Sequence, residues 1–314
     1  MANKKDITIT DSSSGEYHVP VLLRQTLDGL AVKPGGIYVD CTFGGGGHAK
    51  ALLQQLNTAG RLFVFDQDAD AAKNVPADDR VVFVPSNFRH LQRFMRLHKT
   101  TGVDGIMADL GVSSHQFDEP ERGFSTRHDA NLDMRMDRRQ SLTAFDVVNT
   151  YSEQQLHHLF ERYGEVTNAK TLARTIVAIR SSASLKTISN FKAALHAVVK
   201  GNPNKYFAQV FQALRIEVND ELGVLRELLE QIPQLLKPGG RVAIITFHSL
   251  EDRLVKNFFR NGTFGELETH PFENVASASQ LTIITKKPIT AEADELKRNP
   301  RSRSAKLRIA EKKM

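Results

Sequence analysis

The sequence predicts an α/β fold: a doubly wound, mostly parallel sheet with an antiparallel edge and an inserted all-helical segment. Three observations support this prediction. Short, continuously apolar runs alternate with helix-length segments in the first part of the chain, as expected for parallel strands buried on both faces. A polar stretch and amphipathic helical patterns interrupt this alternation over 125–205, and strand-like runs then return. The length of 314 residues suits one large and one small domain.

We expect four strands before the interruption, and three of them end in an acidic residue. They cover 37–40, 61–66, 81–84 and 105–109, and the acids are Asp40, Asp66 and Asp109. A run of four glycines follows the first strand and leads into a helix expected at 49–56. We therefore assign 1–124, together with 206–314, to the sheet domain.

The segment 125–205 is expected to be a small helical insertion. Ser152 and Gln155 form a capping box, apolar residues follow at helical spacing, and Gly164 ends the helix. Two more helical stretches are expected at 169–180 and 189–200, and Gly201–Asn204 breaks the pattern.

The sheet resumes after the insertion. A single apolar stripe from Phe211 to Ile232 predicts one long helix, and Lys237–Gly240 predicts a turn into a fifth strand at 241–247. Two further strands are expected at 281–285 and 306–310. Because no helix-length segment clearly separates these two, we expect them to pair antiparallel at one edge of the sheet.

Composition excludes several classes of protein. Cys41 is the only cysteine, so neither an internal disulfide nor a Cys-x-x-Cys zinc site can form, and we expect no metal. The polar start Met1–Asp6 has no apolar core of a secretory signal, and no run approaches the ~18 apolar residues of a membrane helix. We therefore expect a cytoplasmic protein without membrane contact.

Positive charge is segregated along the chain, whose formal net charge is +6. Residues 120–210 hold 13 basic and 8 acidic residues, and residues 286–314 hold 10 and 4. This distribution fits a polyanionic partner docked on part of the surface, and it fits equally a solvated helical face with a basic tail.

The glycine run predicts a ligand loop, for which three ligands compete. A phosphate-binding P-loop would end in Gly-Lys-Ser/Thr, but this loop ends Gly47-His48-Ala49. A dinucleotide would place phosphates near Asp40, whereas S-adenosylmethionine brings a sulfonium and an ammonium and no phosphate. Asp66 lies 22 residues after Gly44, where an acid can accept both ribose hydroxyls of either a dinucleotide or the sulfonium nucleoside.

Asp109 is the candidate catalytic residue. It ends the fourth strand and should face the same crevice as the glycine loop. A carboxylate beside the methyl donor suits methylation of an exocyclic amine, since it accepts an N–H hydrogen bond and increases electron density on nitrogen. Methylation of a pyrimidine carbon usually needs a cysteine nucleophile, and Cys41 sits in the cofactor loop instead. The alternative role for Asp109 is a helix N-cap.

The chain resembles the bacterial small-subunit ribosomal RNA cytosine-N4 methyltransferases, the MraW or RsmH family. The resemblance spans nearly the whole chain and rests on the runs 38–48, 109–116, 122–125, 132–137, 211–216, 246–253 and 299–304. It implies a class I, Rossmann-like methyltransferase fold, S-adenosyl-L-methionine as donor, and the N4 amine of one cytidine in 16S rRNA as acceptor, by direct transfer.

The resemblance also implies functional residues. It implies that the cofactor contacts Gly46, Gly47, His48, Asp66, Phe88, Asp109 and Gln116, and the glycine loop and the positive charges of the donor add Gly44 and Asp40. The catalytic candidates are Asp109, Ser113 and His248. The insertion would recognise RNA, with phosphates held by Arg127, Arg135, Arg138, Arg139, Arg298, Arg301 and Arg303. The expected partner is the assembled or nearly assembled small subunit, and a homodimer is compatible with the sequence.

The sequence departs from the family pattern at two places, and two rival functions compete with the one that the resemblance implies. Thr126–Asn131 replaces an aromatic residue followed by Asp-Gly-Pro, and the stretch between Asn261 and Ile289 is short. A nicotinamide-dependent oxidoreductase would need a phosphate site, and the carboxylate of Asp40 near that position disfavours phosphates. A non-catalytic RNA-binding module would not need the acids at the strand ends.

Overall fold

The computed structural model describes residues 20–265 and 279–314. Met1–Asp6 and much of the short stretch between Asn261 and Ile289, both considered above, lie outside these ranges. Within the described part of the chain, no helix combines the length and the apolar character needed to cross a membrane.

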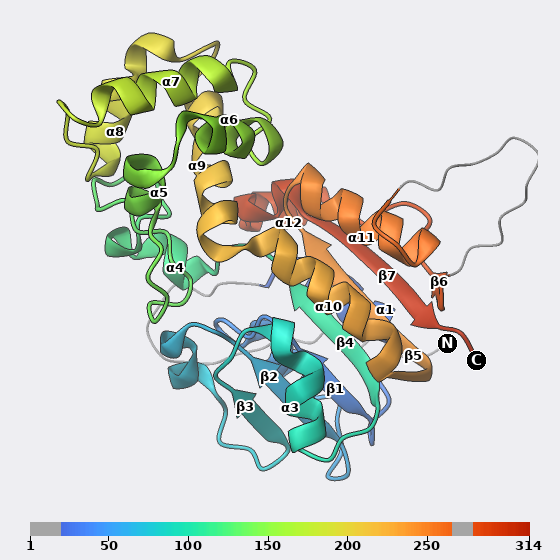
Figure 1. Cartoon of the computed structure of the whole chain (residues 1–314). Helices are drawn as coiled ribbons and strands as arrows, with labels where there is room; N and C mark the ends of the chain where they lie inside the picture. Colours follow the sequence, from blue (N-terminus) through green and yellow to red (C-terminus); the bar gives the residue numbers. More distant parts are fainter. Residues whose placement is uncertain (1–19, 266–278) are drawn as a thin grey trace, which may run out of the picture.

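Seven strands of the described chain form one sheet in the order β3-β2-β1-β4-β5-β7-β6 (Figure 1). Strands β1 to β5 pair in parallel, whereas β7 is antiparallel to both β5 and β6. The predicted parallel sheet with an antiparallel edge is confirmed. The strands are β1 Ile37–Asp40, β2 Arg61–Phe65, β3 Val81–Val84, β4 Val103–Asp109, β5 Leu236–Thr246, β6 Leu281–Ile283 and β7 Lys306–Lys312.

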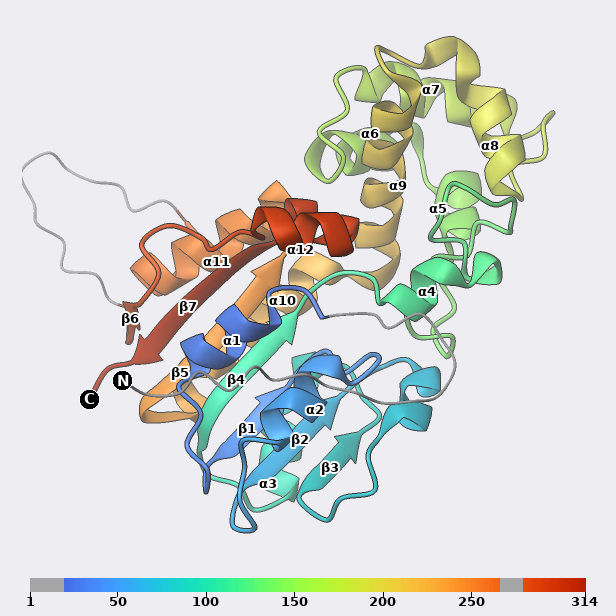
Figure 2. The same cartoon turned by 180° about the vertical axis from the view of Figure 1, so that it is seen from behind.

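Helices cover both faces of this sheet, which explains why its parallel strands are continuously apolar. Tyr38 packs in a cluster with residues of α1 and α2, and the next residue, Val39, packs on the opposite face with residues of α3, α10 and α11. Figure 1 shows the second set of helices in front of the sheet, and Figure 2 shows the first set. The helices are α1 Leu23–Leu30, α2 Gly47–Leu53, α3 Leu91–Leu97, α10 Glu221–Leu235 and α11 Ser249–Asn261.

A helical lobe, which we define as helices α5 to α9, stands beside the sheet (Figures 1 and 2). The capping box of Ser152 and Gln155 begins α6 as the sequence indicates. One hydrophobic cluster holds the lobe together, and it includes α9 residues as far as Val218. The lobe consists of α5 Ala144–Thr150, α6 Glu153–Arg162, α7 Ala169–Ile179, α8 Ile188–Leu195 and α9 Pro203–Asn219.

The prediction of one long helix from Phe211 to Ile232 is wrong. The helix is interrupted at Asp220, which adopts the left-handed conformation with φ 48° and ψ 39° and separates α9 from α10. Aspartate tolerates this conformation better than most residues, and the apolar stripe continues across the break. The break brings Asn219 and Glu221 to the wall of the cavity described below.

Two further differences concern the last part of the sheet. The expected turn at Lys237–Gly240 lies inside β5, where the pairing with β4 shifts register and Gly239 has φ 71°. The expectation that no helix separates the last two strands is also wrong. The helix α12, Ala293–Arg298, and the short 3-10 helix η5, Pro300–Ser304, lie between β6 and β7, which nevertheless pair antiparallel.

Candidate active site

A cavity of about 690 Å³ lies at the carboxyl ends of four parallel strands. Residues at or just beyond the ends of β1, β2, β4 and β5 line it: Cys41, Asp66, Asp109 and Phe247. The order of strands reverses between β1 and β4, so the cavity occupies the crevice where open α/β sheets bind ligands. Several of the predicted site residues therefore meet in one place.

The glycine loop forms one wall of the cavity. Gly44 and Gly46 have φ values of 50° and 76°, a conformation that favours glycine. A Cβ atom added at Gly45 would have no neighbour within 4 Å, so the backbone there is open to a ligand, whereas one at Gly47 would lie 2.3 Å from Pro20. The helix that follows is shorter than expected, Gly47–Leu53. Gly44 and Gly47 line the cavity; Gly46 shapes the turn and is not among the lining residues.

Asp40 ends β1 and is 1% exposed. Its Oδ1 accepts a hydrogen bond of 3.0 Å from the Thr42 backbone N–H, but its buried Oδ2 has no hydrogen-bond partner. Burial raises the pKa of Asp40 to about 7, although the Thr42 hydrogen bond opposes the shift. Asp40 is not among the lining residues, whereas the next residue, Cys41, is, so direct contact between Asp40 and a cofactor remains a prediction.

Asp66 follows β2 and lines the cavity. Its two carboxylate oxygens accept hydrogen bonds from the backbone N–H groups of Gly44, at 2.7 Å, and Asp68, at 2.8 Å. Burial raises its pKa to about 6, and these two hydrogen bonds limit the rise. Asp66 thus ties the glycine loop to the segment after β2, where the sequence places a ribose-binding acid.

Asp109 ends β4 on the same cavity, and its buried Oδ1 has no hydrogen-bond partner. Burial raises the pKa of this carboxyl well above its usual range, and the negative charges of Asp40 and Glu251 raise it further. His48 Nδ1 lies 3.8 Å from Asp109 Oδ2. Because burial lowers the pKa of His48 to about 4, this imidazole is neutral at pH 7 and does not neutralise the carboxylate.

His48 is oriented by the chain that precedes α1. Its Nε2 lies 2.9 Å from the Val21 carbonyl oxygen, so Nε2 carries the proton in the neutral ring and Nδ1 presents a lone pair toward Asp109. His48 lines the cavity, as predicted, but it cannot serve there as a cation.

Ser113 and Gln116 also line the cavity, and both support local structure. They form the capping box of α4, Ser114–Asp118, in which Ser113 Oγ accepts from the Gln116 N–H and Gln116 Oε1 accepts from the Ser113 N–H. Gln116 Nε2 donates to Asp68 Oδ2 at 2.8 Å. The predicted adenine-side residue Phe88 lines the cavity as well, in the 3-10 helix η2, Phe88–His90, that follows β3.

The predicted catalytic His248 has a different place. It caps the start of α11, and it is not among the lining residues, whereas its neighbours Phe247 and Glu251 are. Glu251 Oε2 accepts from the Phe247 N–H at 2.8 Å, and its Oε1 lies 3.2 Å from His248 Nε2. This geometry makes His248 a positioning group for Glu251; a catalytic role remains a prediction.

Glu221, His248 and Glu251 present ligand atoms within 4.8 Å of one another. Both oxygens of Glu221, however, accept hydrogen bonds from Arg215, Nε at 2.8 Å and Nη2 at 2.9 Å. A guanidinium therefore already neutralises Glu221, and we assign no metal to this cluster.

The seven arginines predicted to bind RNA have three kinds of environment. Arg135 and Arg139 form ion pairs with Asp133 and Asp137, two residues earlier in the chain. Arg127, Arg138, Arg298 and Arg303 are exposed. Among all seven, Arg301 is the one found in the cavity lining of the described chain; it pairs with Asp118 and lies over the Phe117 ring, 5.1 Å from its centroid.

Sequence reasoning missed several lining residues. Phe247 and Gln67 follow β5 and β2, so the strand-end rule could have found them. Met136 comes from the segment that leads into the helical lobe, Asn219 from the end of α9, and Glu221 and Val224 from α10. No local pattern marks these residues, because the break at Asp220 and the fold of the lobe bring them to the cavity.

Comparison with known proteins shows which family the chain resembles. The model of the MraW methylase family matches residues 15–313. A ribosomal RNA small subunit methyltransferase H of Parabacteroides distasonis is 53% identical over 299 residues, covering 94% of this chain and 97% of that protein. The protein of the same name from Flavobacterium johnsoniae is 54% identical, covering 95% and 98%.

Among solved structures, an rRNA methylase from Streptococcus thermophilus aligns with 95% of this chain and all of that chain, at 11% identity and a TM-score of 0.41. The match to the family model covers nearly the whole chain, and the two relatives named above are more than 50% identical to it over almost their full lengths. The chain therefore belongs to the MraW methylase family.

Proposed function

We propose that this protein transfers a methyl group from S-adenosyl-L-methionine to the exocyclic N4 amine of one cytidine in 16S ribosomal RNA. Membership of the MraW methylase family and relatives named ribosomal RNA small subunit methyltransferase H support the methylation of small-subunit RNA. The motif runs that resemble the cytosine-N4 methyltransferases support the choice of atom. The residues around the cavity support the choice of donor and the mechanism.

The observation that carries the proposal is the state of the acids around the cavity. Asp40 Oδ2 and Asp109 Oδ1 are buried without hydrogen-bond partners, and burial raises the pKa of Asp40, Asp66 and Asp109. Such a site favours a cationic ligand, whose charge compensates for lost hydration, and it disfavours phosphates. S-adenosylmethionine has a sulfonium and an ammonium group and no phosphate, so it fits this site better than a dinucleotide.

The chain offers a matching contact for each part of the donor. The glycine loop, with its open backbone at Gly45, follows Asp40 in the chain, which suits the methionine moiety. Asp66 suits the ribose hydroxyls, and Phe88 in the next loop can pack on adenine. When bound, S-adenosylmethionine supplies an electrophilic methyl group.

Asp109 then acts on the acceptor. Its unpartnered Oδ1 accepts an N–H hydrogen bond from the cytosine amine, which orients the amine and increases electron density on nitrogen. After transfer the nitrogen has one proton too many, and the Asp109 carboxylate can take it. Cys41 lines the cavity, but burial raises the pKa of its thiol well above the usual range, so it stays protonated and supports direct transfer without a covalent enzyme intermediate.

The RNA would approach past the helical insertion, residues 125–205. The target base would have to leave its stack to reach a cavity of this kind. Exposed Arg127, Arg138, Arg298 and Arg303 would hold phosphates, and Arg301 lies close enough to the cavity to contact the flipped nucleotide. We further propose a cytoplasmic enzyme that acts on the assembled or nearly assembled small subunit, with a homodimer as a compatible state.

Asp109→Asn tests the proposal. The variant keeps the shape of the side chain but cannot accept the proton, so we expect kcat to fall about 100-fold or more. Transfer of a labelled methyl group to 16S RNA and to small subunits measures this effect, and mass spectrometry of the nucleosides identifies N4-methylcytidine. Wild-type turnover by the variant would contradict the role of Asp109. Recovery of 5-methylcytidine would contradict the choice of atom.

A further inference from the structure

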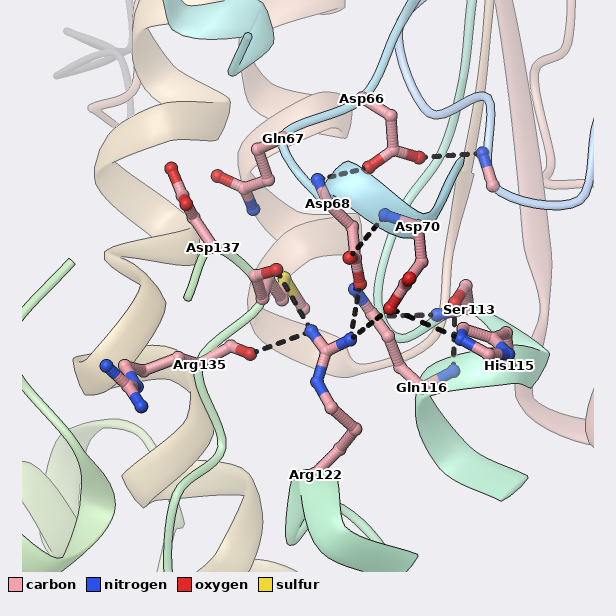
Figure 3. A network of polar contacts seen from close by, with 12 residues as sticks. Asp66, Gln67, Asp68, Asp70, Ser113, His115, Gln116, Arg122, Arg135 and Asp137 are labelled. Carbon is pink, nitrogen blue, oxygen red and sulfur yellow. Dashed lines mark hydrogen bonds and ion pairs between the residues drawn. The ribbon is translucent and has the colours of Figure 1, made fainter. Parts of the chain in front are cut away.

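Arg122 is a buried cation that touches two functional parts of the molecule. It ends the short 3-10 helix η3, Pro120–Arg122, and its side chain is 2% exposed. Figure 3 shows its guanidinium between the segment after β2 and the segment that leads into the helical lobe. In the site described above Arg122 has no role, since it does not line the cavity.

On one side Arg122 contacts the acids that follow the ribose-binding position. Its Nη1 lies 2.7 Å from Asp68 Oδ2, an ion pair by distance, and Gln116 Nε2 donates to the same oxygen at 2.8 Å. The backbone N–H of Asp68 donates to Asp66 Oδ1 at 2.8 Å. Asp66 is therefore separated from Arg122 by a single residue (Figure 3).

On the other side Arg122 holds the backbone that enters the helical lobe. Its Nη2 donates to the carbonyl oxygens of Arg135 and Met136, both at 3.1 Å. Asn219, at the end of α9, completes the arrangement: its Oδ1 accepts from the Met136 N–H at 2.7 Å, and its Nδ2 donates to the Met134 carbonyl at 2.8 Å. Met134 has φ 61°, so these contacts hold it in the left-handed region, which is unusual for methionine.

The segment 134–136 is thus fixed from two directions, and Met136 lines the cavity. A movement of the Asp66–Asp68 segment would shift Asp68 relative to Arg122. Because Arg122 also binds the carbonyl groups of Arg135 and Met136, the same movement would act on the segment 134–136. A guanidinium suits this double role, because it presents several donors in a rigid plane. A lysine ammonium at this position could keep the ion pair with Asp68 but not both carbonyl contacts at once.

We propose that Arg122 is a positioning residue that couples occupancy of the cofactor site to the placement of the helical lobe for RNA binding. The inference rests on the proposed function, in which Asp66 binds the cofactor and the lobe contacts RNA. Coupling of this kind is a free energy shared by the two ligands, so it works in both directions. Cofactor binding tightens RNA binding, and RNA binding tightens cofactor binding by the same factor.

Calorimetric titration with S-adenosylhomocysteine, in the presence and absence of small subunits, tests the proposal. We expect the subunits to tighten binding of the nucleoside by about 5-fold or more in the wild-type protein. We expect Arg122→Lys and Asn219→Ala each to bring this factor below about 2-fold, because each removes contacts that hold the segment 134–136 in place. Arg80→Lys is the matched control: Arg80 also pairs with an aspartate, Asp78, and donates to a carbonyl, that of Leu56, but outside the cavity lining.

The outcomes separate the two proposals. If the wild-type protein binds neither S-adenosylhomocysteine nor small subunits, the proposed function fails and the inference fails with it. If it binds both without mutual effect, or if Arg122→Lys lowers the melting temperature but keeps the full factor, Arg122 has a purely structural role and only the inference is overturned. Loss of the factor in Arg122→Lys and Asn219→Ala, with Arg80→Lys unchanged, supports it.

Discussion

The acidic residues on the two sides of the cavity differ in whether other groups of the protein pair with their carboxylates. At the ends of β1, β2 and β4, the pKa of Asp40, Asp66 and Asp109 is raised, and two of these carboxylates have an oxygen without a partner. Across the cavity, Glu221 is paired with Arg215. Burial would raise the pKa of Glu251, but His248 and Arg215 nearby hold it below its ordinary value.

This difference separates acids that bind ligands from acids that support structure. The first group bears a desolvation cost that the protein offsets only in part, as expected for groups that a cationic ligand completes. The second group is already neutralised and fixes the position of Phe247 and of the α9–α10 break. Disturbing an acidic residue should therefore affect ligand binding on the first side and stability on the second.

The largest effect is expected from Arg215→Met on the paired side. The substitution leaves Glu221, whose side chain is 9% exposed, without its cation, so we expect a loss of about 3 kcal/mol in the free energy of unfolding. Urea denaturation measures this loss. The double variant Arg215→Met/Glu221→Met removes both charges and should recover most of it. A loss below about 1 kcal/mol in the single variant would show that the pair is solvated.

The sheet and the ligand side of the cavity could be predicted from local patterns. Continuous apolar runs reveal parallel strands, and ligands bind beyond their carboxyl ends, so Asp66 and Asp109 are found by position alone. The capping box at Ser152 is equally local, because its partners are three residues apart. Each of these patterns spans only a few residues, and the folded structure contains the element that the pattern predicts.

Other parts of the cavity could not be predicted, because a concealed helix break and contacts between residues distant in sequence shape them. The apolar stripe from Phe211 to Ile232 conceals the break at Asp220, since hydrophobic spacing does not report one left-handed residue. Arg301 reaches Asp118 across 183 positions, and Asn219 reaches Met136 across 83. Whether Asp40 touches the ligand depends on side-chain direction, which position at a strand end does not settle.

On the unpaired side, Asp40→Asn should stabilise the ligand-free protein and weaken cofactor binding. The pKa of about 7 in the folded protein lies above the ordinary value of 3.8, so the native state holds an extra proton and stability falls as pH rises between these values. The variant should therefore melt higher than the wild type at pH 8 but not at pH 4. We expect its affinity for S-adenosylmethionine at pH 8 to fall about 10- to 100-fold, because one buried negative charge is lost.

Differential scanning fluorimetry and calorimetry measure the two effects of Asp40→Asn. Asp28→Asn is a suitable control, because Asp28 pairs with Arg24 on the surface and its side chain is 72% exposed. It should leave both quantities nearly unchanged. A variant at Asp40 that binds as tightly as the wild type would remove this residue from the ligand-binding group.

A smaller effect is expected from pH on the wild-type protein. Asp40 and Asp66, with pKa values of about 7 and about 6, are protonated in acid, and a cationic ligand binds their ionised forms. Affinity for S-adenosylmethionine should therefore fall as pH drops from 8 to 5.5, by up to about tenfold per unit for each group below its pKa, and level off above about pH 8. S-adenosylhomocysteine lacks the sulfonium charge and should show a shallower dependence. Equal, flat profiles for the two nucleosides would mean that the raised acids do not face the donor, and the contrast between the two sides of the cavity would then reflect folding alone.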